Sequence, residues 1–195
     1  MRKLYLECYS GISGDMTVAA LLDLGVPGEY LMKELEKLHL DGYEIKISKT
    51  KKNQITATDF DVILNDEHKD EHGHEHVHTH VHEEDVKECH EQEYSHEHTH
   101  VHNSYREIKE FILASELSKK VKEMILKIFQ VIAEAEAQVH GTTVDEVHFH
   151  EVGAVDSIVD ISAAAICLDY LGFDSIVTSE IWEGKGHVWC QHGRI

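Results

Sequence analysis

The stretch Val-His-Phe-His-Glu-Val-Gly-Ala-Val-Asp-Ser-Ile-Val-Asp, residues 147–160, brings nitrogen and oxygen ligands close together in the chain. Those ligands are His148, His150, Glu151, Asp156 and Asp160. If the first five residues are extended, both histidines leave the same face, and a helix from about Ala154 would place both aspartates on one face. The stretch therefore predicts a metal or phosphate site. The alternative is that the histidines pack or cap, while the aspartates are solvated near a helix N-terminus.

A second group of candidate residues follows the first predicted strand, Lys3–Cys8. The turn Ser-Gly-Ile-Ser-Gly-Asp-Met, residues 10–16, leads into an apolar helix that we expect over Thr17–Leu24. A strand, a glycine turn and a helix N-terminus present backbone N–H groups to an anion, so this order predicts a phosphate site. The side chains that could join these N–H groups are Ser10, Ser13 and Asp15. The alternative is that Ser13 caps the helix and the glycines only permit the turn.

The hydrophobic periodicity of the remaining chain predicts both helices and strands. The expected helices are Glu29–Leu38, Ser104–Ser115, Glu116–His140 and residues 154–171. The expected strands are Tyr43–Lys52 and Gln54–Leu64, a hairpin that turns at Asn53, followed by Asp174–Ile181 and Lys185–Cys190. We therefore expect an α+β fold with a small mixed sheet and packed helices.

Residues 65–102 depart from every hydrophobic period. They contain twelve of the chain's 18 histidines, and they have twelve acidic residues but only two lysines. So few apolar groups cannot compensate for the entropy of ordering, so we expect a disordered insertion. Neutral imidazoles at this density bind divalent metals such as nickel, copper, zinc and cobalt. The tract therefore predicts metal binding, and the alternative is a linker that only keeps the protein soluble. The candidate metal ligands are His72, His74, His76, His78, His80, His82, His96, His98, His100 and His102.

The insertion divides one expected core domain into residues 1–64 and 103–195. The formal charge of −19 argues against nucleic acid or an anionic membrane as a partner. The four cysteines form no C-x-x-C pair, which favours a reducing compartment. Without a signal peptide or a bilayer-spanning apolar stretch, the sequence predicts a soluble, cytoplasmic protein.

Several motifs occur in an order that is specific to one family. They are residues 11–16, Gly-Ile-Ser-Gly-Asp-Met; 19–25, Ala-Ala-Leu-Leu-Asp-Leu-Gly; 133–141, Ala-Glu-Ala-Glu-Ala-Gln-Val-His-Gly; the stretch 147–160; 184–187, Gly-Lys-Gly-His; and 192–195, His-Gly-Arg-Ile. With them the chain resembles the nickel-insertion proteins of nickel-pincer cofactor synthesis, the LarC family. The resemblance covers nearly the whole chain apart from the histidine-rich insertion.

The resemblance implies a CTP-dependent cyclometallase of the lyase class. Such a protein places nickel into pyridinium-3,5-bisthiocarboxylic acid mononucleotide and forms carbon–nickel and sulfur–nickel bonds, while CTP yields CMP and diphosphate. A divalent cation such as Mn or Mg would accompany the CTP, and the product would serve an apoenzyme such as lactate racemase. The implied catalytic residues are Asp15, His148, His150 and Glu151, and the implied binding residues are Gly11, Ser13, Gly14 and Asp15. The implied metal ligands are His148, His150, Glu151, Asp156 and Asp160.

Two features depart from the family pattern. Glu7 stands near the end of the first strand, where the family usually has an Asp. Family members also continue into a C-terminal domain associated with the nucleotide, so we expect this chain to be a fragment or the first product of a split reading frame. We expect a homo-oligomer. The alternative functions are a non-enzymatic nickel storage or delivery protein and a metal-dependent phosphohydrolase.

Overall fold

A computed structural model describes most of the chain on both sides of the histidine-rich insertion. The described residues are 1–65, 104–149, 155–182, 184, 186–187, 189–190 and 193–194. The disorder expected for residues 65–102 and the metal-binding histidines within them therefore fall outside the described residues. The same is true of His150 and Glu151.

The fold is α+β, as the sequence predicts. The helices are α1 (Gly14–Asp23), α2 (Gly28–Glu36), α3 (Tyr105–Ala114), α4 (Lys119–His140) and α5 (Val155–Leu171), with a short 3₁₀ turn, η2 (Val144–Glu146). The strands are β1 (Lys3–Leu6), β2 (Tyr43–Lys52), β3 (Ile55–Leu64), β4 (Ser175–Thr178), β5 (Trp189–Cys190) and β6 (Gly193–Arg194). Most predicted elements lie where the periodicity placed them.

Within the described residues, the strands form three separate two-stranded pairs. Strands β1 and β4 are parallel, whereas β2 with β3 and β5 with β6 are antiparallel. The β2–β3 hairpin turns through Asn53 and Gln54, both at positive φ, as a two-residue hairpin of the I′ kind requires. Because the hairpin packs on α1, it does not extend the β1–β4 pair.

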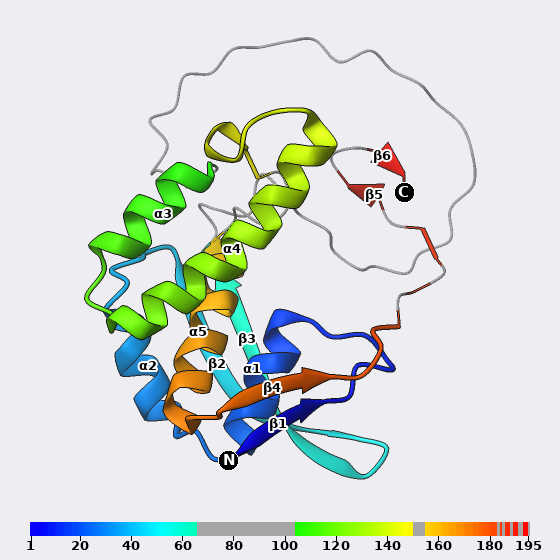
Figure 1. Ribbon diagram of the computed structural model, residues 1–195. Coiled ribbons are helices and arrows are strands. Elements are labelled where there is room, and N and C mark those ends of the chain that lie inside the picture. The colour runs from blue at the N-terminus through cyan, green and yellow to red at the C-terminus, as the bar shows by residue number, and fades with distance from the viewer. Residues whose placement is uncertain are drawn as a thin grey trace.

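Helix α5 lies at the centre of the molecule (Figure 1), in contact with α1, α2, α4 and β3. Its buried side chains occupy nearly every side of the helix, and small residues such as Ala163 and Ala165 let the neighbouring elements approach. The core joins residues from both sides of the insertion, among them Leu21, Phe129 and Ile158. The two segments therefore share one hydrophobic core.

Local signals explain several helix ends. The Ser104 side chain accepts a hydrogen bond from the Glu107 N–H, and the Glu107 carboxylate accepts one from the Ser104 N–H. Helix α3 therefore begins with a capping box. Gly141 ends α4 at a φ of 66°, which a side chain would disfavour. Helix α1 begins at Gly14 instead of the expected Thr17, because the Thr17 N–H already donates to the Ser13 carbonyl at 3.0 Å.

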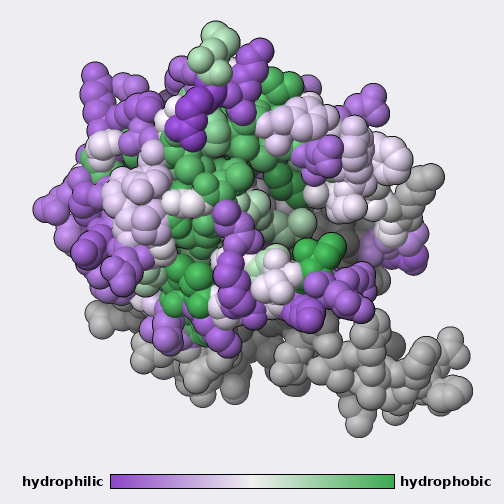
Figure 2. All heavy atoms as spheres, turned by 90° about the horizontal axis from the view of Figure 1, so that it is seen from below, coloured by the Kyte–Doolittle hydropathy of each residue, from purple (hydrophilic) through white to green (hydrophobic). Residues whose placement is uncertain are grey.

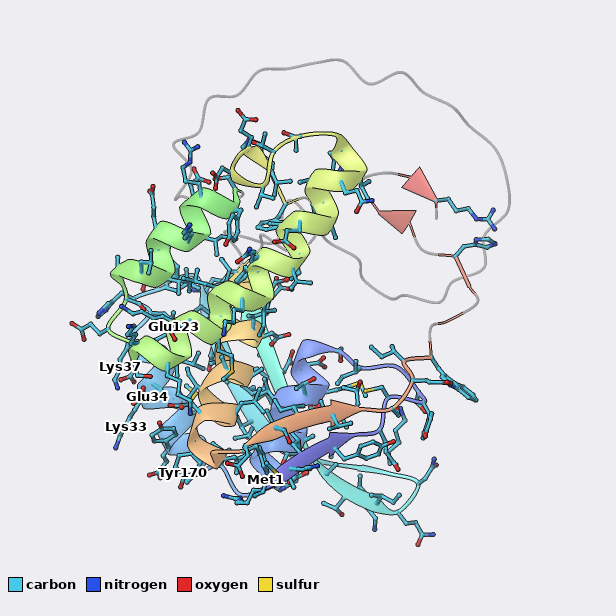
Figure 3. The ribbon with its side chains drawn as sticks, in the orientation of Figure 1. Met1, Lys33, Glu34, Lys37, Glu123 and Tyr170 are labelled. Atoms are coloured by element: carbon cyan, nitrogen blue, oxygen red, sulfur yellow. The ribbon has the colours of Figure 1, made fainter. Side chains whose placement is uncertain are left out.

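A rim of charged residues covers the packing of α2 beside α4 and α5. Figure 3 shows Glu34 and Lys37 together on α2, with Glu123 of α4 and Tyr170 of α5 nearby, and the Glu34–Lys37 pair has an N–O distance of 2.5 Å. The rings of Tyr30 and Tyr170 have centroids 4.6 Å apart. Helix α2 contributes Leu31 and Leu35 to the core, and we attribute its packing mainly to these buried leucines.

Hydrophobic side chains also reach the surface. In Figure 2 they gather in a band across the face seen from below, between charged side chains. The exposed ones include Tyr5 of β1, Met16 and Leu24 of α1, and Ile176 and Val177 of β4. No helix in the described ranges combines the length and apolar character needed to cross a bilayer.

Candidate functional site

The glycine turn between β1 and α1 is held by backbone hydrogen bonds. The Cys8 carbonyl accepts from the Gly11 N–H at 3.1 Å, and Gly11 has a φ of 82°, a conformation that favours glycine. Ser13 is extended and occupies the N-cap position of α1, yet its side chain makes no capping hydrogen bond. Its hydroxyl donates to the Asp15 carboxylate instead. The turn thus leaves its capping hydroxyl engaged with a carboxylate.

Gly14 lies directly against Asp160 of α5. A Cβ atom at position 14 would be 2.4 Å from the Asp160 Oδ2 atom and 2.7 Å from its Cβ atom. A side chain therefore cannot be placed there without movement of the α5 residue. The φ of Gly14 lies outside the left-handed region, so its backbone conformation does not require glycine. Glycine is required there because Asp160 approaches so closely.

The Asp160 carboxyl group has an unusual environment. Burial, helped by the nearby Asp15 and Asp156 carboxylates and opposed by a hydrogen bond from the Asp15 backbone, raises its pKa to about 6. Its Oδ1 atom is buried and has no hydrogen-bond partner among the described residues. The arrangement can hold a proton, since protonation would relieve the repulsion between the carboxylates.

The two motifs separated in the sequence thus meet in space. Asp15 from the glycine turn and Asp156 and Asp160 from α5 form one acidic group, which we call the carboxylate junction. Asp156 is exposed and its carboxylate accepts a hydrogen bond from the Ser157 N–H at 2.7 Å. The contact between α1 and α5 creates a junction that neither motif contains alone.

His148 lies on a different part of the molecule. Val147 and Phe149 on either side of it are buried, whereas His148 is exposed, so the short segment alternates as an extended chain does. The Phe149 ring packs against Phe129 at 6.1 Å and Tyr105 at 6.5 Å between centroids. This anchors the segment to α3 and α4 while it presents the imidazole to solvent.

The structure does not group His148 with the carboxylate junction. In the part of the chain that the structure describes, no three His, Cys, Asp or Glu side chains are arranged closely enough to hold a metal ion. His150, Glu151 and the insertion histidines are not among those residues. The ligand set proposed from the sequence thus remains a prediction.

A groove that sequence reasoning missed lies between β1 and α1. It has a volume of about 450 Å³, within the range of small-molecule sites. Its lining residues are Leu4, Tyr5, Leu6, Glu7, Gly11, Ile12, Met16, Thr17, Ala20, Asp23 and Leu24.

An exposed aromatic pair lies near one end of the groove. The Tyr9 and Trp182 rings have centroids 5.8 Å apart and an interplanar angle of 73°. A hydrogen bond with Tyr9 raises the pKa of Tyr5, which lines the groove. The pair combines a residue after β1 with one after β4, so it could be found only once the parallel pairing of these strands was known.

Comparison with known proteins gives a consistent result. A family model described as nickel insertion protein matches residues 4–195. A pyridinium-3,5-bisthiocarboxylic acid mononucleotide nickel insertion protein from Clostridium acetobutylicum is 56% identical over 99% of this chain and 46% of its own length. A protein of the same description from Alkaliphilus metalliredigens is 50% identical over 98% of this chain and 42% of its own length. The chain spans less than half the length of these relatives, and no solved structure matches it.

Proposed function

This chain belongs to the nickel insertion protein family, and we propose that it takes part in inserting nickel into pyridinium-3,5-bisthiocarboxylic acid mononucleotide. The observation that carries the proposal is the contact between Gly14 and Asp160, where two motifs of the family resemblance form one acidic junction. Carboxylates can contribute oxygen ligands to a divalent cation, and nickel is the cargo of the reaction, but the three described carboxylates do not form a metal site by themselves. Because the chain covers less than half of its relatives, the complete activity is a proposal for this chain together with the remaining part.

The carboxylate junction has two proposed roles. Asp156 and Asp160 would help to hold nickel, and Asp160 could accept a proton, since its pKa of about 6 lies near neutrality. The phosphate of the mononucleotide would bind at the turn formed by Gly11, Ser13, Gly14 and Asp15. Three carboxylates repel a phosphate, so we propose that it binds there only together with a divalent cation.

His148, His150 and Glu151 are proposed to hold nickel at the point of transfer. The exposed position of His148 supports this role, because an imidazole that is not buried in the core is accessible to metal. CTP with Mn or Mg is proposed to bind mainly in the part of the relatives that this chain does not cover. We also propose that the protein is cytoplasmic and homo-oligomeric. Its product would pass to an apoenzyme such as lactate racemase.

A direct test is to assay the full-length protein containing this chain with nickel, the mononucleotide and CTP. Mass spectrometry should detect a nickel-bearing mononucleotide in the wild type and a strongly reduced yield in Asp160→Asn. The control is His39→Ala, because His39 is exposed and contacts Glu116, which belongs to neither motif. Full activity in Asp160→Asn would remove the junction from the mechanism, and a wild type that makes no product would overturn the proposed function.

The second candidate function is nickel storage or delivery, favoured by the twelve histidines between residues 65 and 102. We propose instead that this tract raises the local nickel concentration without taking part in bond formation. Deleting residues 67–102 from the full-length protein should then increase the nickel concentration for half-maximal insertion and leave the plateau unchanged. A lost plateau at saturating nickel would place the tract in the active site, whereas a wild type that binds nickel without any turnover would be a store.

Hydrolysis of simple phosphoesters without nickel would instead favour a phosphohydrolase.

A further inference from the structure

The aromatic pair formed by Tyr9 and Trp182 is not explained by the packing of the core. Tyr9 is 49% exposed and Trp182 is 60% exposed, so neither residue is enclosed by the core. The interplanar angle of 73° makes the two rings the walls of an open corner. A flat ligand could stack on one ring and meet the edge of the other, which are the favoured geometries of aromatic contacts.

The corner is built on the same backbone anchor as the glycine turn. The buried Cys8 carbonyl accepts hydrogen bonds from both the Gly11 N–H at 3.1 Å and the Trp182 N–H at 3.2 Å. The Cys8 N–H in turn donates to the Ser179 hydroxyl oxygen at 2.8 Å, which ties the segments after β1 and β4 together. The position of Trp182 relative to the turn is therefore fixed by the fold.

The location also favours ligand binding. Figure 1 shows β1 and β4 pointing in the same direction, toward the turn that precedes α1, and ligands of parallel sheets bind beyond the carboxyl ends of the strands. Gly11 lies beside Trp182, because a Cβ at position 11 would be 3.8 Å from the Trp182 carbonyl oxygen. The ring and the phosphate of one mononucleotide could thus lie at neighbouring places on this edge.

Charge selects one kind of ring for this corner. The pyridinium ring of the proposed substrate is electron-poor and positively charged, and the faces of tyrosine and tryptophan attract such rings. The exposed carboxylate of Glu7 lies in the adjoining groove and adds negative charge. We propose that Tyr9 and Trp182 form the platform on which the pyridinium ring stacks, so that the phosphate of the mononucleotide can reach the glycine turn. This inference rests on the proposed function.

Fluorescence gives a direct test, since the chain has two tryptophans and Trp189→Phe leaves Trp182 as the single reporter. Nicotinic acid mononucleotide, which has a pyridinium ring and a phosphate, should quench Trp182 fluorescence in a saturable manner. Uridine monophosphate, with a neutral ring, should bind at least several-fold more weakly. Equal affinity for both nucleotides would overturn the role of the ring charge and with it the platform.

Variants of the full-length protein make the test specific. Trp182→Ala should weaken binding of the pyridinium mononucleotide about tenfold, measured by calorimetry, whereas Trp182→Phe should retain most of the affinity. Ile181→Ala is the matched control, because Ile181 is the exposed neighbour without an aromatic ring, and it should leave the affinity unchanged.

The possible failures can be separated. Unchanged affinity and unchanged KM for nickel insertion in Trp182→Ala would overturn the platform and leave the proposed function standing. A changed sedimentation mass without a changed affinity would overturn it in favour of an interface between copies of the chain. A wild-type protein that binds no pyridinium mononucleotide would overturn both the platform and the proposed function.

Discussion

An aspartate lies at each end of α1, and the pKa values of the two carboxyl groups shift in opposite directions. At the N-terminal end, where the helix dipole favours a negative charge, the pKa of Asp160 is raised to about 6. At the C-terminal end, where the dipole opposes a negative charge, hydrogen bonds from Lys49 and Thr58 lower the pKa of Asp23 to about 2. Burial and direct partners therefore outweigh the helix dipole at both ends.

The difference separates structural from functional use of a carboxylate. Asp23 has its partners on the β2–β3 hairpin, with Lys49 Nζ 2.6 Å away, and so joins the hairpin to α1. Asp160 has an oxygen without a partner among the described residues and two acidic neighbours. A satisfied ion pair holds two elements together, whereas an unsatisfied carboxyl group remains available to a proton or a cation.

The largest effect on stability should come from Gly14→Ala at the N-terminal end. Its Cβ would overlap the Asp160 side chain, and overpacking of this kind costs about 1–3 kcal/mol of unfolding free energy. Urea unfolding measures the change. Gly184→Ala is the control, because a Cβ there meets no atom within 4 Å.

A double-mutant cycle attributes that effect to its cause. In an Asp160→Gly background the overlapping atoms are absent, so Gly14→Ala should cost much less than in the wild type. An equal cost in both backgrounds would show that the contact with Asp160 is not what requires glycine at position 14.

The next effect is a pH dependence of the Asp160 carboxyl group. Its pKa is higher in the folded chain than its ordinary value of 3.8, so the folded state holds the proton more tightly. The stability of the wild type relative to Asp160→Asn should be greatest below pH 3.8 and should fall as pH rises through 6. Because the group is only partly buried, we expect a loss of about 1–2 kcal/mol, less than the full shift implies. Unfolding curves for both proteins between pH 4 and 8 give the difference, and parallel curves would contradict the prediction.

Asp23→Asn should have a smaller effect and the opposite pH dependence. The lowered pKa means that its stabilising contribution is present above the ordinary value of 3.8 and is lost as pH falls through about 2. Because the pair is solvent-exposed, the cost at neutral pH should be about 0.5–1 kcal/mol. Lys49→Met in the same assay should give a comparable loss, and additive losses in the double variant would mean that the two side chains do not interact.

The smallest effect on stability should come from replacing His148 and His150 together with Ala. His148 is exposed and its buried neighbours keep the segment in place, so the unfolding free energy should change by less than about 0.5 kcal/mol. Nickel insertion by the full-length protein should nevertheless be lost. Unchanged turnover in the double variant would remove these histidines from the mechanism.

Local patterns in the sequence predicted much of the fold. The hairpin followed from period-two alternation around Asn53, and α4 followed from its apolar stripe and the glycine at its end. The apolar pattern predicts that α1 begins at Thr17, because Gly14 and Asp15 are common turn residues. The helix begins instead at Gly14, and Ser13 has the N-cap position of the alternative interpretation, without its side-chain hydrogen bond.

The candidate site was predictable only in parts. Both motifs were recognised from their residue types, but the contact between Gly14 and Asp160 depends on how α1 packs against α5. The parallel pairing of β1 with β4 likewise depends on the tertiary fold, so the corner formed by Tyr9 and Trp182 had no signal within either strand. Periodicity describes a segment and not its distant neighbour.

The pairing of β1 with β4 also has a consequence for synthesis of the protein in the cell. Lys3 is paired with Ser175, so the first strand must wait for about 170 further residues before its partner leaves the ribosome. At roughly 5–20 residues per second this delay is on the order of 10–30 s. During that time β1 and the apolar face of α1 are incompletely covered, so the nascent chain is a natural client for a chaperone that binds exposed hydrophobic segments.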